Sequence, residues 1–146
     1  MPRKTDSSNP ADWIAIAASD LEGVQHLVGK QIAYSMCLSK LAEVLEKIIK
    51  AELLRQGWFL LKIHDLVKLS DELRERDPDL ADRIQPLTEA LADKYFTDRY
   101  PGFDLEDEDW PALNTRVAEV AHLLAVVKDR LAAAKPPDPP SAEPGR

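Results

Sequence analysis

Residues 113–131, with the sequence LNTRVAEVAHLLAVVKDRL, carry the clearest structural pattern in the chain. Large aliphatic side chains recur there at alternating spacings of four and three residues: Leu113, Val117, Val120, Leu124, Val127 and Leu131. This spacing places one apolar stripe along a single face of an α-helix. Asp107 or Asp109 can cap the start of that helix. The stretch therefore predicts a long amphipathic helix that packs against other helices.

The N-terminal half of the chain has two further helical segments. Asn9-Pro10 combines a capping side chain with a proline at the first helical position, which predicts a helix over about 10–28. Gly29 is its expected end. The longest helix is predicted over about 31–56, with Gly57 at its C-terminal cap. Its apolar residues cover a wide arc, as expected for a helix that touches several neighbours.

The region between these helices and the last one has two shorter helical patterns. His64 or Asp65 can start a short helix, and Asp77-Pro78 repeats the cap-plus-proline signal for another helix. Pro86 falls inside the second one and is expected to kink or split it. No segment alternates as a strand. The sequence therefore predicts an all-α fold, an up-down bundle of four main helices plus one short helix.

The chain has 146 residues, enough for one domain. We expect a disordered N-terminal tail over residues 1–9 and the helical bundle over residues 10–134. A Pro-rich tail is expected over residues 135–146, because five of the eleven prolines lie in the last eleven residues. Such a tail can bury very little surface.

Composition excludes several classes of protein. No apolar run is long enough to cross a membrane, and the N-terminus does not resemble a secretory signal. The single cysteine, Cys37, excludes an internal disulfide framework and a multi-cysteine zinc site. Cys37 lies in an apolar arc, which favours an inert core thiol over a nucleophile. We expect a cytoplasmic protein with no metal and no cofactor.

The formal charge of −7 argues against nonspecific DNA binding. The charge is unevenly distributed, however. Residues 30–68 have a balance of +3, and the rest of the chain has a balance of −10. A small phosphate-bearing ligand therefore remains compatible with the sequence.

Three segments resemble a known family in order and spacing. Residues 45–51, LEKIIKA, are similar to an A-E-K-x-L-K-A run and are followed by Gly57. Residues 64–69, HDLVKL, are similar to an H-D-L run that opens the next helix. Tyr95 followed by Arg99-Tyr100-Pro101 is similar to an aromatic-x-x-x-R-Y-P segment. Together they resemble the HEPN domain (higher eukaryotes and prokaryotes nucleotide-binding domain) over roughly residues 11–133. The chain departs from the family at Ala42-Glu43, where a pair of glutamines is common.

The resemblance implies a compact helical bundle that commonly forms a homodimer. It also implies a polar or basic groove linked to nucleotides or RNA. HEPN domains often operate beside a small nucleotidyltransferase, frequently as a toxin–antitoxin pair. None of these properties follows from composition or periodicity.

Two lysines of the second helix are candidate ligands for phosphate. Lys47 and Lys50 could contact it as point charges. However, Glu43 and Glu46 each stand four residues before one of these lysines, in the favoured orientation for ion pairs within a helix. We therefore favour a solvated, salt-bridged face as the explanation of Lys47 and Lys50.

His64 and Asp65 could form a polar pair beside a ligand. The favoured alternative is that one of them caps the next helix. Glu52 lies on the same arc as apolar core residues, where a carboxylate is costly unless it is paired. Either Glu52 lies at a wet end of the bundle, or it pairs with His64 or an arginine.

Arg99 and Tyr100 are the best single candidates for ligand contact. Arginine can bind phosphate with two hydrogen bonds, and tyrosine can stack on a base. The alternative is that Arg99 pairs with a nearby acid, such as Asp98 or Asp104, while Tyr100 packs on the bundle.

Ribonuclease members of the wider HEPN superfamily carry an arginine followed by four to six residues and a histidine. No histidine follows Arg99 at that distance. Arg116 and His122 match the spacing, but they lie about 120° apart around one helix. The pair is therefore a runner-up as a catalytic site.

Three hypotheses follow for the function. The first is a noncatalytic HEPN-type module that binds a nucleotide, RNA or a partner nucleotidyltransferase. The second is a metal-independent ribonuclease that uses Arg116 and His122. The third is a structural adaptor that docks another protein through its Pro-rich tail or an apolar helix face.

Overall fold

The computed structural model describes residues 7–58, 64–92, 94 and 108–134. Within these ranges it contains only helices and no strand, which confirms the predicted all-α class. The helices are α1 (Pro10–Gly29), α2 (Tyr34–Arg55), α3 (Leu66–Arg76), α4 (Pro78–Leu91) and α5 (Trp110–Ala134). Residues 1–6 of the expected N-terminal tail (1–9) and the whole expected Pro-rich tail (135–146) lie outside the described residues.

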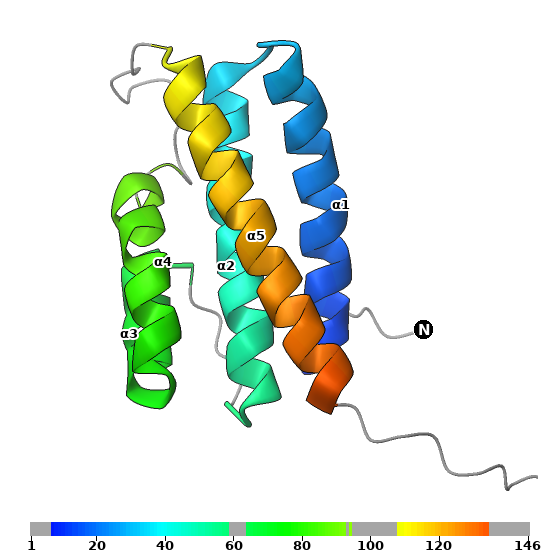
Figure 1. Cartoon of the computed structure of the whole chain (residues 1–146), viewed down its shortest axis with the longest axis vertical. Coiled ribbons are helices and arrows are strands. Elements are labelled where there is room, and N and C mark those ends of the chain that lie inside the picture. Colours follow the sequence, from blue (N-terminus) through cyan, green and yellow to red (C-terminus); the bar gives the residue numbers. More distant parts are fainter. Residues whose placement is uncertain (1–6, 59–63, 93, 95–107, 135–146) are drawn as a thin grey trace, which may run out of the picture.

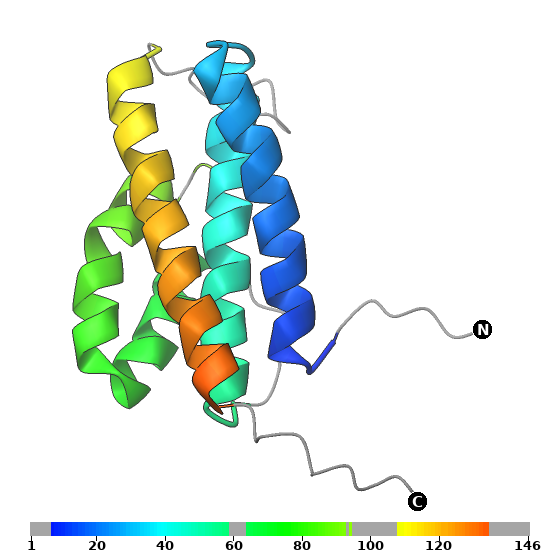
Figure 2. The same cartoon turned by 45° about the vertical axis from the view of Figure 1, so that its right-hand side comes forward.

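Three long helices form the body of the bundle, and a shorter helical hairpin lies beside them. Figures 1 and 2 show α1, α2 and α5 side by side, with α3 and α4 grouped along one flank. α2 contacts each of the other four helices. α2 is therefore enclosed on most of its circumference, and its polar residues must find partners inside the protein.

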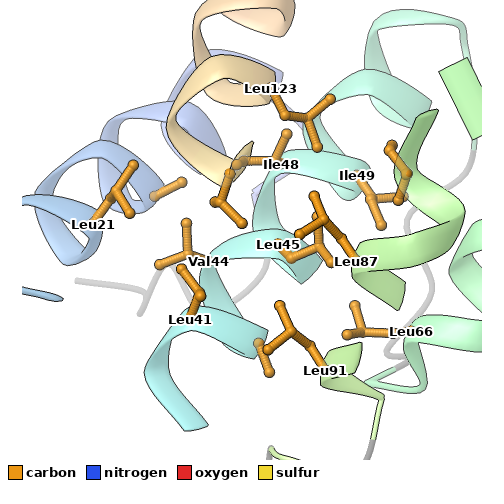
Figure 3. Close-up of a cluster of buried hydrophobic side chains, with 14 of the residues drawn as sticks. Leu21, Leu41, Val44, Leu45, Ile48, Ile49, Leu66, Leu87, Leu91 and Leu123 are labelled. Atoms are coloured by element: carbon orange, nitrogen blue, oxygen red, sulfur yellow. The ribbon is translucent and has the colours of Figure 1, made fainter. Parts of the chain in front are cut away.

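The apolar core is centred on α2. Leu41, Leu45, Ile48 and Ile49 are fully buried there. Figure 3 shows side chains from all the neighbouring helices packed around them: Leu21 of α1, Leu66 of α3, Leu87 and Leu91 of α4, and Leu123 of α5. Burial of one such aliphatic side chain contributes about 1.5–3 kcal/mol. The core explains the wide apolar arc seen in the sequence.

Local side-chain caps fix the starts of α1, α3, α4 and α5, as the sequence predicts, whereas α2 begins without one. The Asn9 side chain accepts a hydrogen bond from the backbone N–H of Ala11 at 3.0 Å. Asp77 and Asp109 cap α4 and α5 in the same way, with acceptor distances of 3.1 Å in both cases. These carboxylates and amides satisfy backbone donors that have no partner within their own helix.

α2 begins at Tyr34 rather than near residue 31, and α1 ends at Gly29, as the sequence predicts. The turn beyond it closes through hydrogen bonds from Gln31 N–H to Val28 O and from Ile32 N–H to Leu27 O, both 3.0 Å. Gln31 has a φ of 54°, and Ala33 has a φ of 59°. Two non-glycine residues thus adopt the left-handed conformation that a sequence pattern assigns to glycine.

α4 runs through Pro86 without a break, so of the two expected effects, a kink or a split, the split does not occur. Proline removes one hydrogen bond, to the carbonyl four residues earlier, at Asp82. Pro86 and Asp82 are both exposed, so water can satisfy that carbonyl.

The first described residues fold back on α1. The indole Nε1–H of Trp13 donates to the Ser7 carbonyl at 2.7 Å, and the Ser7 hydroxyl contacts Asp12 at 2.6 Å. In the described parts of the chain, no helix is both long and apolar enough to cross a membrane.

Candidate functional site

The described candidate ligand residues come from three parts of the bundle. Lys47 and Lys50 lie on α2, and His64 and Asp65 lie at the start of α3. Arg116 and His122 lie on α5. Arg99 and Tyr100, the best single candidates from the sequence, lie outside the described residues.

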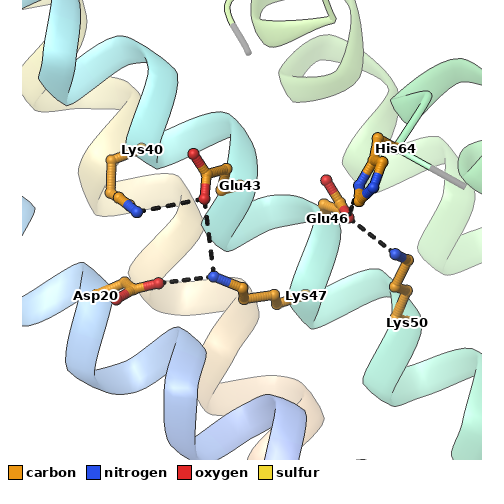
Figure 4. Close-up of polar contacts among 7 residues, drawn as sticks. All are labelled: Asp20, Lys40, Glu43, Glu46, Lys47, Lys50 and His64. Atoms are coloured by element: carbon orange, nitrogen blue, oxygen red, sulfur yellow. Dashed lines mark hydrogen bonds and ion pairs between the residues drawn. The ribbon is translucent and has the colours of Figure 1, made fainter. Parts of the chain in front are cut away.

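Lys47 links α2 to α1. Its Nζ lies 2.8 Å from an Asp20 carboxylate oxygen and 3.9 Å from Glu43 Oε1. Lys40 also contacts that Glu43 oxygen, at 3.3 Å. Figure 4 shows these side chains as one chain of alternating charges between the two helices. The predicted pair of Lys47 with Glu43 is therefore present, within a larger structural network.

Lys50 is buried, so the prediction of a solvated face is wrong at this position. Only 2% of Lys50 is exposed, and its Nζ lies 2.8 Å from Glu46 Oε2. The same ammonium group lies 5.1 Å from the centre of the Trp13 ring, a cation–π contact. The predicted ion pair with Glu46 forms, but Trp13 of α1 covers it. Trp13 belongs to a different helix, so the residue spacing within α2 could not predict that Lys50 is buried.

His64 meets the same carboxylate from outside. Its Nδ1 lies 2.8 Å from Glu46 Oε2, and 59% of the His64 side chain is exposed. Glu46 thus contacts both Lys50 and His64, as Figure 4 shows. The structure brings Lys50 and His64 together through Glu46, a residue that the sequence marked only as the partner of Lys50.

Asp65 is the N-cap of α3. Its side chain accepts hydrogen bonds from the backbone N–H groups of Val67, at 2.9 Å, and Lys68, at 3.3 Å. The capping interpretation of Asp65 is confirmed, and His64 does not share that role.

Glu52 is the most deeply buried charged residue in the described part of the chain. Only 1% of Glu52 is exposed, and it contacts Arg55 at 2.7 Å and Arg130 at 3.0 Å. Arg130 also contacts Asp77 at 2.7 Å. The predicted pairing of Glu52 with an arginine is confirmed, while the wet environment and the His64 partner are not found. The cluster joins the ends of α2 and α5 to the cap of α4.

The pKa of Glu52 reflects two opposing effects. Burial raises the pKa of this carboxyl group. Hydrogen bonds from Arg55 and Gln56 and the charges of Arg55 and Arg130 lower it, and the net shift is downward. The pKa of Asp77 is also lowered overall. Burial raises it, but Arg130 and a backbone hydrogen bond from Leu80 lower it by more. Both carboxylates are therefore held in the charged form, as expected for structural ion pairs.

An open groove lies between α4 and α5. It has a volume of about 540 Å³. Its lining combines apolar groups, among them Pro86, Leu87 and Leu123, with the polar side chains of Arg83, Glu119 and His122. Volume and lining both suit a small organic ligand. Sequence reasoning missed Arg83, because no motif or spacing marks it.

Only one member of the Arg116–His122 pair lines the groove. His122 lines it, whereas Arg116 is not among the lining residues. Arg116 instead contacts Glu119 of its own helix at 3.1 Å. Arg116 and His122 therefore do not meet in one site within this chain.

The described residues do not favour a cysteine nucleophile or a metal site. The Cys37 thiol is fully buried, and burial raises its pKa, which disfavours the reactive thiolate. In the described ranges, no group of three His, Cys, Asp or Glu side chains is arranged to hold a metal ion.

Comparisons with known proteins identify the family of the chain. No curated protein and no solved structure matches the chain. A family comparison matches residues 10–130 to the HEPN domain. That range begins at the first residue of α1 and ends in the last two turns of α5, so it includes all five helices. The chain therefore belongs to the HEPN domain family of nucleotide- and RNA-related helical modules.

Proposed function

We propose that this protein is a noncatalytic HEPN-type binding module that takes a nucleotide or RNA. The groove between α4 and α5 is the observation that carries the proposal. It is the size of a small-ligand site, and its lining combines apolar side chains with the guanidinium of Arg83. The family match supports the same class of ligand.

The noncatalytic form is supported by the position of Arg116. A ribonuclease that used Arg116 and His122 would need both side chains at one phosphodiester group. Arg116 is held by Glu119, and only His122 lines the groove. A catalytic pair would therefore require a rearrangement of α5 side chains or a second copy of the chain.

Binding and cleavage are tested in one experiment. Purified protein is mixed with labelled nucleotides and with labelled single-stranded RNA, and both affinity and RNA integrity are measured. We expect saturable binding and intact RNA. Absence of binding to every probe contradicts the proposal, and RNA cleavage that disappears in His122→Ala establishes the ribonuclease instead. The variant Arg99→Ala tests the remaining sequence candidate, because unchanged affinity removes Arg99 from the site.

We also propose that the module forms a homodimer and acts with a partner nucleotidyltransferase, in a toxin–antitoxin-like system. Large apolar side chains are exposed near one end of α1 and α2, at Ile32 and Met36, and further along α1 at Ile16. Ile32 and Met36 are the residues that we propose for the contact between the two chains. Light scattering should give the mass of two chains, and Met36→Glu should lower it. A strictly monomeric chain that retains no partner in pull-down contradicts both the dimer and the adaptor alternative.

A further inference from the structure

Arg83 differs from the other arginines in the described part of the chain. That part contains six arginines, and ion pairs engage five of them: Arg55, Arg74, Arg76, Arg116 and Arg130. Within the same part, no hydrogen bond or ion pair engages the guanidinium of Arg83. Arg83 is exposed on α4 and lines the groove against α5. Its charge is therefore available to a ligand.

The charge of the groove depends on Arg83. Glu119 is the acidic residue of the lining, and Arg116 neutralises it at 3.1 Å. This leaves the Arg83 guanidinium as the unbalanced charge of the lining. His122, on the α5 side of the groove, adds a ring nitrogen that can donate a hydrogen bond. An anionic group is the electrostatic complement of such an edge.

Four of the eight residues that line the groove are apolar. Pro86 and Leu87 come from α4, and Ala118 and Leu123 come from α5. A nucleotide combines the two chemistries that this groove presents, because its base has a flat apolar face and its phosphate is anionic. A guanidinium binds phosphate oxygens through two parallel N–H groups, which a lysine cannot reproduce.

We propose that the groove between α4 and α5 binds one nucleoside 5′-monophosphate, with the phosphate on Arg83 and the base against the apolar lining residues. His122 is the second donor to the phosphate. This inference rests on the proposed nucleotide-binding function and assigns a site to it. We commit to the free mononucleotide because a groove of about 540 Å³ is the size of a small-molecule site.

The first test removes the charge. Calorimetric titration with AMP, GMP, CMP and UMP measures the dissociation constant of the full chain and its variants. We expect Arg83→Ala to weaken binding roughly 10- to 100-fold, the loss expected for charged hydrogen bonds, and Arg83→Lys to restore part of it. Lys128→Ala is the matched control, because it removes the same charge from an exposed position of α5 outside the groove lining. We expect its affinity to stay within about twofold of the wild type.

The second test fills the groove without touching a charge. Ala118 is exposed and lines the groove, so Ala118→Trp places a large ring in the binding space. Ala125 is also an exposed alanine of α5 but does not line the groove, which makes Ala125→Trp the matched control. We expect loss of binding in the first variant alone, with both variants as thermally stable as the wild type.

The outcomes separate the site from the function. If the wild type binds neither mononucleotides nor RNA, the proposed function fails, and the site fails with it. If the wild type binds and all the variants bind equally well, the function stands and the groove assignment is wrong. If the wild type binds RNA but no monophosphate, the mononucleotide is the wrong ligand.

Discussion

At the scale of single residues, Glu52 shows how a buried charge is held in this fold. It is almost inaccessible to water and is contacted by Arg55 and Arg130. Glu52→Gln keeps the shape but leaves both guanidinium groups without this carboxylate. We expect the free energy of unfolding to fall by about 3 kcal/mol, the lower end for a broken buried ion pair, because the two arginines are partly exposed. Urea denaturation measures the change.

The control for Glu52 is a surface pair. Arg74 contacts Asp82 at 2.7 Å with both side chains exposed, so Arg74→Ala should lower the free energy of unfolding by at most about 1 kcal/mol.

The pH dependence of stability is a second test of the Glu52 ion pairs. The folded-state pKa of Glu52 is lowered, so its stabilising effect is full above the unfolded pKa of about 4.3 and is lost as pH falls through the lower folded value. The gap between wild type and Glu52→Gln should shrink below about pH 4. A gap that persists unchanged in acid contradicts the ion-pair explanation.

Thr88 is the opposite case, a buried polar group without compensation. Within the described residues, its Oγ1 is the one buried side-chain oxygen or nitrogen that lacks a hydrogen-bond partner. Thr88→Val replaces the hydroxyl with a methyl group of similar size, and we expect a gain of about 1 kcal/mol in the free energy of unfolding. Thr115→Val is the matched control, because the exposed Thr115 hydroxyl donates to the Pro111 carbonyl at 3.2 Å. A loss of stability in Thr88→Val would mean that the hydroxyl has a partner in solution.

At the scale of elements, the turn between α1 and α2 carries backbone strain. Gln31 adopts a φ of 54°, which a residue with a Cβ atom tolerates poorly. Gln31→Gly should raise the free energy of unfolding by about 0.5–1 kcal/mol, after the entropy that glycine adds to the unfolded chain. Gln25→Gly makes the same chemical change inside α1, at an exposed site, and should lower stability by about 1 kcal/mol. Thermal unfolding should show opposite shifts, and equal shifts contradict a left-handed Gln31.

The elements also show what the sequence can and cannot predict. Caps such as Asp65 and Asp77 are local, since the side chain and the backbone groups it satisfies lie within three residues, and the sequence predicts them correctly. The left-handed conformation of Gln31 was not predicted, because no glycine marks that position. The burial of Lys50 was missed because Trp13 comes from another helix.

The groove between α4 and α5 could not be predicted from the spacing of residues in the sequence. Arg83 and His122 come from helices that are joined through residues outside the described part of the chain. Nothing in the spacing of either helix indicates that these two side chains line one space. The Arg116–His122 spacing, which the sequence does show, joins two residues that do not share that space.

At the scale of the whole molecule, the charge distribution limits how nucleic acid can be bound. The net charge is −7, and most cations in the described helices already contact a carboxylate. Arg83 is thus one of few cations in the described helices without a carboxylate partner. Binding through one site of this kind releases few counterions from a nucleic acid.

This distribution predicts a weak dependence of RNA affinity on salt. For single strands, the slope of log K against log salt concentration is about −0.7 for each neutralised phosphate, so contacts by Arg83 and at most His122 give a slope of about −0.7 to −1.4. Titrations of single-stranded RNA across a range of salt concentrations measure this slope, and Arg83→Ala should flatten it. A steep slope, about −3 or beyond, would require four or more neutralised phosphates. That result would mean that RNA follows a basic surface formed by residues outside the described helices or by two copies of the chain.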